Sequence, residues 1–92
     1  MNILNLKTPN EIKKIISSNV RRRRKELHLN QEELAKRADV SYGSIKRFES
    51  EGEISLNSLI KIAIVLDCAD DLIHLFERKQ YNSIEEIINE QK

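Results

Sequence analysis

The sequence predicts an all-α domain of five short helices with a short C-terminal helical tail. Along most of the chain, apolar residues recur every three or four positions, which is typical of amphipathic helices. The 92 residues include only 2 Gly and 1 Pro, too few for the many turns of a β-sandwich or barrel. Because roughly 100–200 residues form one domain, a single domain is expected.

The first helix is predicted to begin at Pro9 and to run to about Glu26. Thr8, Pro9 and Glu11 have the pattern of a capping box with proline at the first helical position. An apolar stripe on this helix consists of Ile12, Ile16 and Val20 at spacings of four, with Leu27 seven residues later at its end.

Two short helices follow, over residues 31–38 and 42–50. Asn30 and Ser41 are expected to cap them, and Gly52 is a plausible stop for the second. The side chains expected to face inward are Leu34 and Ala35 in the first helix and Ile45 and Phe48 in the second.

The remaining chain predicts two more helices and a tail. Ser55 opens a helix over 56–67 that is apolar on nearly all sides, which predicts burial on more than one side and contact with a partner. A fifth helix over 69–76 is expected to direct Leu72, Leu75 and Phe76 inward. Ser83 to Glu86 form a second capping box, which opens a last helix with one apolar side: Ile84, Ile87 and Ile88.

This pattern divides the chain into an N-terminal arm or lone strand over residues 1–9, a domain over 10–76 and a tail over 77–92. Charge is distributed unevenly along it. Residues 1–47 carry 12 Lys and Arg against 5 Asp and Glu, whereas residues 48–92 carry 4 against 10. A basic half beside an acidic half suggests a polyanionic partner at one end, although charges that simply cover solvated helices give the same totals.

Several classes of protein are excluded by what the sequence lacks. It has no run of about 18 apolar residues and no signal peptide, so we expect a cytoplasmic protein without a membrane partner. Its single cysteine, Cys68, excludes an internal disulfide and a cysteine-rich zinc site. No phosphate-cradling glycine loop, metal-ligand spacing or nucleophile–base pair appears. We therefore expect no enzymatic activity, metal or cofactor.

The helices over 31–38 and 42–50 have the spacing of a helix-turn-helix, because about three residues join them. Asp39 stands where the turn favours a residue that tolerates positive φ. Val40 is expected to fill the angle between the helices.

Projection of the second of these helices at 100° per residue separates two faces. Ile45 and Phe48 define the buried side. Lys and Arg can donate to guanine O6 and N7, serine can bond bases or phosphates, and glycine lets the backbone approach closely. An ordinary solvated helix also carries polar residues, but the position within a helix-turn-helix favours DNA reading. The outward residues are Gly43, Lys46, Arg47 and Ser50, flanked by Tyr42 and Ser44.

The segment RKELHLNQEELAKRADVSYGSIKRFES resembles the Cro/phage-repressor (XRE) class of helix-turn-helix proteins, and the likeness covers about residues 10–76. Asp39 departs from the usual Gly, and Asn30 from the usual Thr. The matching residues are Arg24, Leu29, Gln31, Leu34, Ala35, Val40, Ser41, Ile45 and Glu49.

The resemblance implies a five-helix Cro/lambda-repressor-like domain that binds double-stranded DNA, usually as a homodimer on a palindromic operator. It implies that Gln31 touches a backbone phosphate, and that Ser41 to Ser44, with Lys46 and Arg47, meet the groove. It also assigns Arg24 and Glu49 to a partly buried ion pair. A module that kept the fold but lost DNA reading is the alternative.

The basic run from Arg21 to Lys25 points in several directions on a helix. It is either solvated cover with one structural arginine, a source of one or two phosphate contacts, or a localisation signal. Two later features resemble the HipB-type antitoxins: Gly52 to Leu56, and the tail from Ser83 to Ile87 after Phe76. That resemblance implies a repressor of its own operon that binds a HipA-type kinase toxin.

Overall fold

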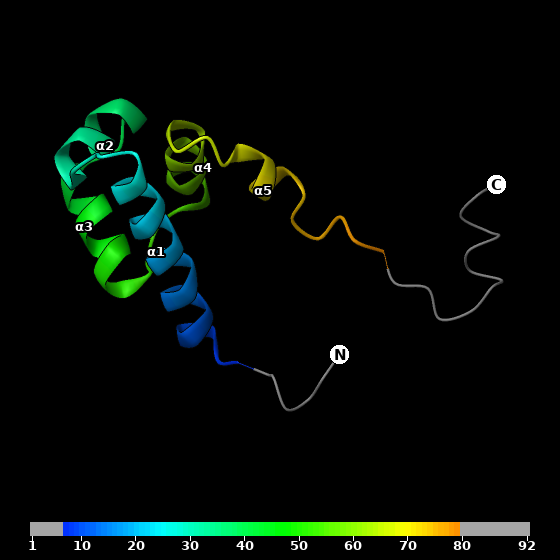
Figure 1. The fold of residues 1–92 in the computed structure, drawn as a ribbon. Helices are drawn as coiled ribbons and strands as arrows, with labels where there is room; N and C mark the ends of the chain where they lie inside the picture. Colours follow the sequence, from blue (N-terminus) through cyan, green and yellow to red (C-terminus); the bar gives the residue numbers. More distant parts are fainter. Residues whose placement is uncertain (1–6, 80–92) are drawn as a thin grey trace, which may run out of the picture.

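The computed structural model describes residues 7–79, which form five helices around one small core (Figure 1). The predicted all-α fold is confirmed, and no strand occurs within this range. Most of the predicted N-terminal arm or strand lies outside the described residues. The predicted last helix from Ser83 lies wholly outside them. The helices are α1 (Pro9–Glu26), α2 (Gln31–Ala38), α3 (Tyr42–Glu51), α4 (Leu56–Val65) and α5 (Ala69–Ile73).

Side-chain caps fix where the first four helices begin. The Thr8, Ser41 and Ser55 hydroxyls each accept a hydrogen bond, at 3.1 Å, from the backbone N–H three residues later. Asn30 and Glu33 form a reciprocal capping box, with bonds of 2.8 and 3.0 Å. Each cap satisfies an N–H group that has no partner inside its helix. The predicted caps at these four positions are therefore confirmed.

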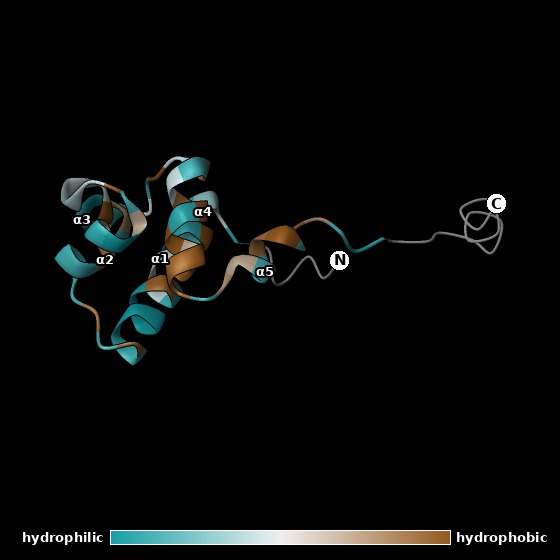
Figure 2. Cartoon of the chain, turned by 90° about the horizontal axis from the view of Figure 1, so that it is seen from above, coloured by the Kyte–Doolittle hydropathy of each residue, from teal (hydrophilic) through white to brown (hydrophobic). Residues whose placement is uncertain are grey.

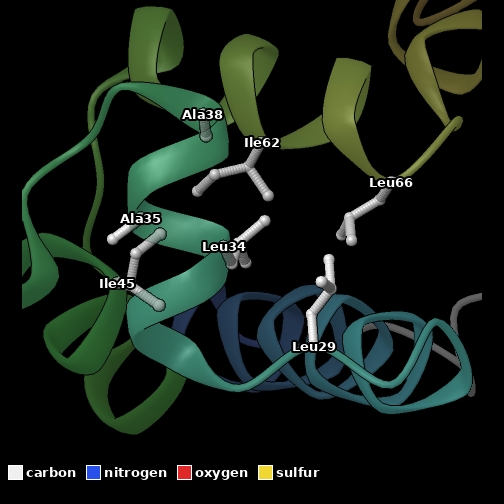
Figure 3. Packing of buried hydrophobic residues seen from close by; sticks show 7 residues of the cluster. All are labelled: Leu29, Leu34, Ala35, Ala38, Ile45, Ile62 and Leu66. Carbon is white, nitrogen blue, oxygen red and sulfur yellow. The ribbon is translucent and has the colours of Figure 1, made fainter.

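The core forms where α2 packs between α3 and α4, while α1 packs across α3 (Figures 1 and 3). Leu34 and Ala35 face inward as predicted, with 0% and 6% of their surface exposed. Val40 is half-buried against this cluster, in the angle between α2 and α3. The buried cluster consists of Leu29, Leu34, Ala35, Ala38, Ile45, Ile62 and Leu66.

Gly52 ends α3 in the left-handed conformation, with φ of +76°, and its N–H donates to the Phe48 carbonyl at 2.8 Å. The predicted stop is confirmed. A Cβ at this position would lie 2.6 Å from Lys13 Cβ, closer than two carbons can approach. Gly52 therefore provides both the backbone turn and the close contact between the α3–α4 loop and α1.

We expect Gly52→Ala to lower the free energy of unfolding by about 1–3 kcal/mol, because alanine disfavours this backbone conformation and its methyl group meets α1. Urea denaturation followed by circular dichroism measures the change. An unchanged unfolding midpoint would show that the loop moves away from Lys13 without loss.

Two predictions about the fifth helix are wrong. It ends at Ile73 rather than at residue 76, and Leu75 and Phe76 are 53% and 99% exposed rather than directed inward. Phe76 adopts a left-handed φ of +60°, so helical spacing no longer predicts which way its side chain points. Leu72 is half-buried and remains on the inner side.

Much of the apolar surface of α4 and α1 is exposed. Most of α4 is apolar (Figure 2), yet in this chain it buries chiefly one side, through Ile62, Ala63 and Leu66. No described element of this chain covers the other faces, so burial on more than one side stays a prediction that depends on a partner. Residues left exposed on these helices include Leu56, Ile60 and Ile64 on α4, and Ile12, Ile15 and Ile16 on α1.

Candidate nucleic-acid interface

Asp39 makes the tight turn between α2 and α3, with φ of +54°. Its N–H donates to the Lys36 carbonyl and the Val40 N–H to the Ala35 carbonyl, the paired bonds of a Schellman motif. Asp39 thus adopts the backbone conformation that glycine usually provides at this position. Because of this backbone conformation and these two hydrogen bonds, the turn has helix-turn-helix geometry without glycine. The Lys61 ammonium on α4 also lies 3.8 Å from the Asp39 carboxylate.

The two faces of α3 are separated as the helical projection predicts. Ile45 and Phe48 are 1% and 2% exposed and anchor the helix against the core and α1. Ser44 is half-buried near the N-terminus of the helix, where its hydroxyl accepts a 2.7 Å hydrogen bond from Ser41. The predicted site residues that are exposed are Ser41, Tyr42, Gly43, Lys46, Arg47 and Ser50.

Each of the two cations on the outward face of α3 is held by a neighbour one helical turn away. The Lys46 ammonium lies 5.0 Å from the centre of the Tyr42 ring, within the range of a cation–π contact. Arg47 Nε lies 3.0 Å from Glu51 Oε2, and both side chains remain mostly exposed. Lys46 and Arg47 thus lie on either side of a strip of small residues, Gly43 and Ser50, on the outward face of α3. Sequence reasoning missed Glu51, although its spacing of four from Arg47 is the signal for such a pair.

Gly43 lies in this strip, and nothing in the chain requires a glycine there. A Cβ at Gly43 would meet no atom within 4 Å, and the residue lies within α3 without a positive φ. Glycine weakens a helix relative to alanine. Packing within the chain therefore does not require glycine at this position. The absence of a side chain leaves the backbone of α3 open to close approach from outside.

We expect Gly43→Ala to change stability and DNA affinity in opposite directions. The added methyl should raise the free energy of unfolding by about 0.5–1 kcal/mol and weaken DNA binding by roughly tenfold, or about 1.4 kcal/mol. Urea denaturation and fluorescence anisotropy with labelled DNA measure the two effects. Unchanged affinity would contradict a DNA contact at Gly43.

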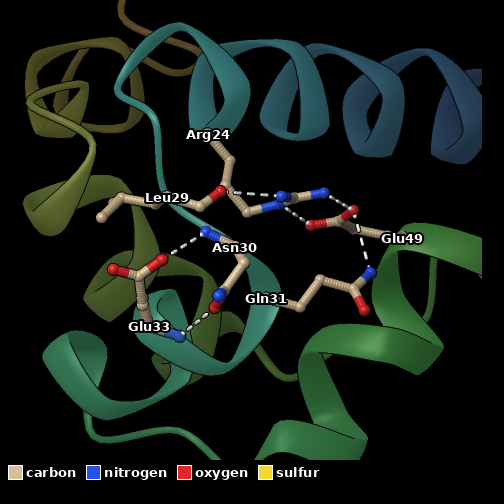
Figure 4. A network of polar contacts seen from close by, with 6 residues as sticks. All are labelled: Arg24, Leu29, Asn30, Gln31, Glu33 and Glu49. Carbon is tan, nitrogen blue, oxygen red and sulfur yellow. Dashed lines mark hydrogen bonds and ion pairs between the residues drawn. The ribbon is translucent and has the colours of Figure 1, made fainter.

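The Arg24 and Glu49 side chains join α1 to α3 beneath this surface (Figure 4). Arg24 Nε and Nη2 donate to the two Glu49 oxygens at 2.7 and 2.8 Å, and the side chains are only 8% and 4% exposed. Arg24 Nη1 also donates to the Leu29 carbonyl at 2.8 Å. This bidentate geometry is the strongest form of the pair.

The pair shifts both of its pKa values toward the charged forms. Burial alone raises the pKa of Glu49, but hydrogen bonds from Arg24 and Gln31 and the charge of Arg24 outweigh it, so the pKa of Glu49 is lowered. The hydrogen bond to Glu49 raises the pKa of Arg24 in spite of burial. Both groups are therefore ionised at neutral pH.

Gln31, the first residue of α2, joins the same network, since its Nε2 donates to Glu49 Oε1 at 3.1 Å (Figure 4). An amide NH2 carries two donor hydrogens, so one remains for a further acceptor. Glu49 thereby holds the start of α2 against α3.

The basic run on α1 divides into separate structural roles. Arg24 is buried in the ion pair. Arg23 Nε donates to the Leu66 carbonyl at 3.0 Å, which ties α1 to the end of α4. Arg22 and Arg23 also pair with Glu26 at 3.5 and 3.4 Å. The run is therefore not one cationic patch.

The fold and this surface define a helix-turn-helix DNA-binding protein. The helix-turn-helix family model HTH_3 matches residues 20–73, more than half of the chain, and the chain belongs to this XRE-type family. The family is one of DNA-binding transcription regulators and not of enzymes. A search of curated proteins finds no significant match. Within residues 7–79, no helix has the length and apolar character needed to cross a membrane.

Proposed function

We propose that this regulator is a sequence-specific repressor that inserts α3 into the major groove of its operator. The exposed cationic face of α3, anchored from behind by Ile45 and Phe48, carries the proposal. Lys46 and Arg47 contact bases or phosphates, and Gln31 contacts a phosphate at the start of α2. The proposed DNA-binding residues are Gln31, Ser41, Tyr42, Gly43, Ser44, Lys46, Arg47 and Ser50.

A nuclease footprint on the DNA just upstream of the gene tests this function. We expect one protected region, with affinity that falls steeply between low and moderate salt because phosphate contacts release counterions. Uniform weak protection along the DNA would leave a non-specific binder. Binding that does not change with salt would contradict the proposed interface.

We also propose that two copies assemble on a palindromic operator through α4 and α5. Leu56, Ile60 and Ile64 repeat every four residues on α4 and are 65%, 40% and 61% exposed, which supports an apolar seam between copies. Such a dimer would place two α3 helices about one DNA turn, ~34 Å, apart.

Ile64→Asp should therefore convert the dimer to a monomer while leaving the fold intact. Sedimentation equilibrium measures the mass, and we expect the dimer dissociation constant to rise by roughly 100-fold, or about 2.7 kcal/mol. Ser58→Asp adds the same charge in the first turn of α4, on the opposite side of the helix from this stripe, and it should leave the dimer unchanged. A wild-type monomer at high protein concentration would contradict the seam.

We propose further that the regulator is the HipB-like antitoxin of a toxin–antitoxin pair and represses its own operon. The support is the resemblance of Gly52 to Leu56 and of the tail from Ser83. Co-expression with the product of the neighbouring gene tests this role. We expect a stable complex with a HipA-type kinase and relief of its toxicity. A neighbouring gene of another kind, or no complex, would leave a stand-alone regulator.

A further inference from the structure

A groove of about 310 Å³ runs between α1, α4 and α5, away from the outward face of α3. Its walls are largely apolar, and Ile16 on α1, Leu59 on α4 and Leu72 on α5 are only partly covered. Cys68 also lines it. Arg23 stands at one edge, held by the Leu66 carbonyl. The groove continues the apolar stripe of α1, in which Ile12 and Ile16 are 46% and 42% exposed.

The sequence of the same chain contains an apolar stripe that fits this groove. The sequence of residues 83–90 begins with a capping-box pattern and predicts a helix with Ile84, Ile87 and Ile88 on one side. Residues 80–92 carry three Glu and one Lys, and Arg22 and Arg23 of α1 line the groove beside Glu26. These two arginines are the groove residues with which the acidic side of the tail can pair.

The connection between groove and tail is long enough for docking. Leu72 already lies in the groove wall, and nine residues separate the end of α5 at Ile73 from Ser83. Nine residues span up to about 30 Å. A tether of this length gives the tail a millimolar effective concentration at the groove, which favours docking within one chain over capture of another.

We propose that residues 83–90 pack as an amphipathic helix into the groove between α1, α4 and α5 of the same chain. The three isoleucines cover Ile16, Leu59 and Leu72, and the acidic side of the tail faces Arg22 and Arg23 of α1. The tail thereby completes the core of the domain and does not depend on DNA binding by α3.

Cys68, the single cysteine of the chain, reports whether the groove is covered. In the full-length protein, Ile87→Asp should speed the reaction of the Cys68 thiol with a disulfide reagent about tenfold, as expected for a helix that is docked about 90% of the time. Asn89→Asp adds the same charge on the opposite side of the tail helix and should leave the rate within about twofold of wild type. Equal rates for wild type and Ile87→Asp would overturn the proposal.

Two further measurements identify the occupant. Nuclear Overhauser effects between the methyl groups of Ile16 and Ile87 are expected in the wild-type protein, and their absence would overturn the proposal even if Cys68 reacts too slowly to report. Protection of Cys68 should be independent of protein concentration. Protection that disappears on dilution would show that a second copy covers Cys68, through its tail or its α4–α5 surface, and would contradict docking within one chain.

Discussion

Glu49→Ala is expected to lower the free energy of unfolding by about 3–5 kcal/mol, because it leaves the Arg24 guanidinium buried without its partner. The Glu49 side chain is 4% exposed and accepts bonds from both Arg24 and Gln31. Its removal therefore also releases the start of α2. Small domains are stable by only about 5–15 kcal/mol, so the variant should unfold at a far lower temperature.

The Arg47–Glu51 pair on the same helix is the matched control. Its side chains are 65% and 60% exposed, and water screens their attraction. Glu51→Ala should therefore change stability by no more than about 1 kcal/mol. Urea denaturation of both variants makes the comparison. Equal small losses would show that Arg24 reaches water or another partner when Glu49 is removed.

The pair also predicts how stability responds to acid. The pKa of Glu49 is lowered in the folded state from its ordinary value of 4.5. Between the folded-state pKa and 4.5, Glu49 is therefore mostly ionised in the folded protein and mostly protonated in the unfolded chain. The stabilisation is therefore complete above pH 4.5 and is lost as the pH falls through the folded-state value. Glu49→Gln should flatten the fall in stability below pH 4.5, and an unchanged acid profile would contradict this role.

Arg47→Glu and Lys46→Glu should each weaken operator binding by about 100-fold or more. A good base contact contributes about 1–3 kcal/mol, and the new carboxylate also repels the DNA phosphates. Neither side chain packs in the core, so unfolding should change by no more than about 0.5 kcal/mol. Fluorescence anisotropy at several salt concentrations measures the affinity.

Lys14→Glu provides the control for a general effect of charge. Lys14 is exposed on α1, which packs against the buried side of α3, so the same charge reversal is made away from the proposed interface. This variant should keep most of its affinity. If all three variants lose affinity equally, the cationic face of α3 has no special role.

Sequence patterns predicted correctly the features that depend on neighbouring residues, namely the helix starts and the buried side of α3. Asn30 and Ser41 mark helix starts because their side chains accept bonds from the next turn, and Ile45 and Phe48 mark the back of α3 because their spacing repeats with the helix. These interactions lie within one or two turns of the chain. They are therefore visible in the sequence.

Contacts between distant elements, and the ends of short helices, were predicted less well. The spacing of Ile12 and Ile16 predicts an apolar stripe but not which element covers it. Leu75 and Phe76 continue the apolar pattern of α5, yet the helix ends before them. The contact of Gly52 with Lys13 joins segments nearly forty residues apart, and no local pattern indicates it.

Chemical protection of the operator bases tests the central claim most directly. Guanine N7 lies in the major groove and adenine N3 in the minor groove, and dimethyl sulfate methylates both. If α3 lies in the major groove, the bound protein should protect guanine N7 within the footprint, and prior methylation there should prevent binding. Protection confined to adenine N3, with guanine N7 fully reactive, would contradict the account.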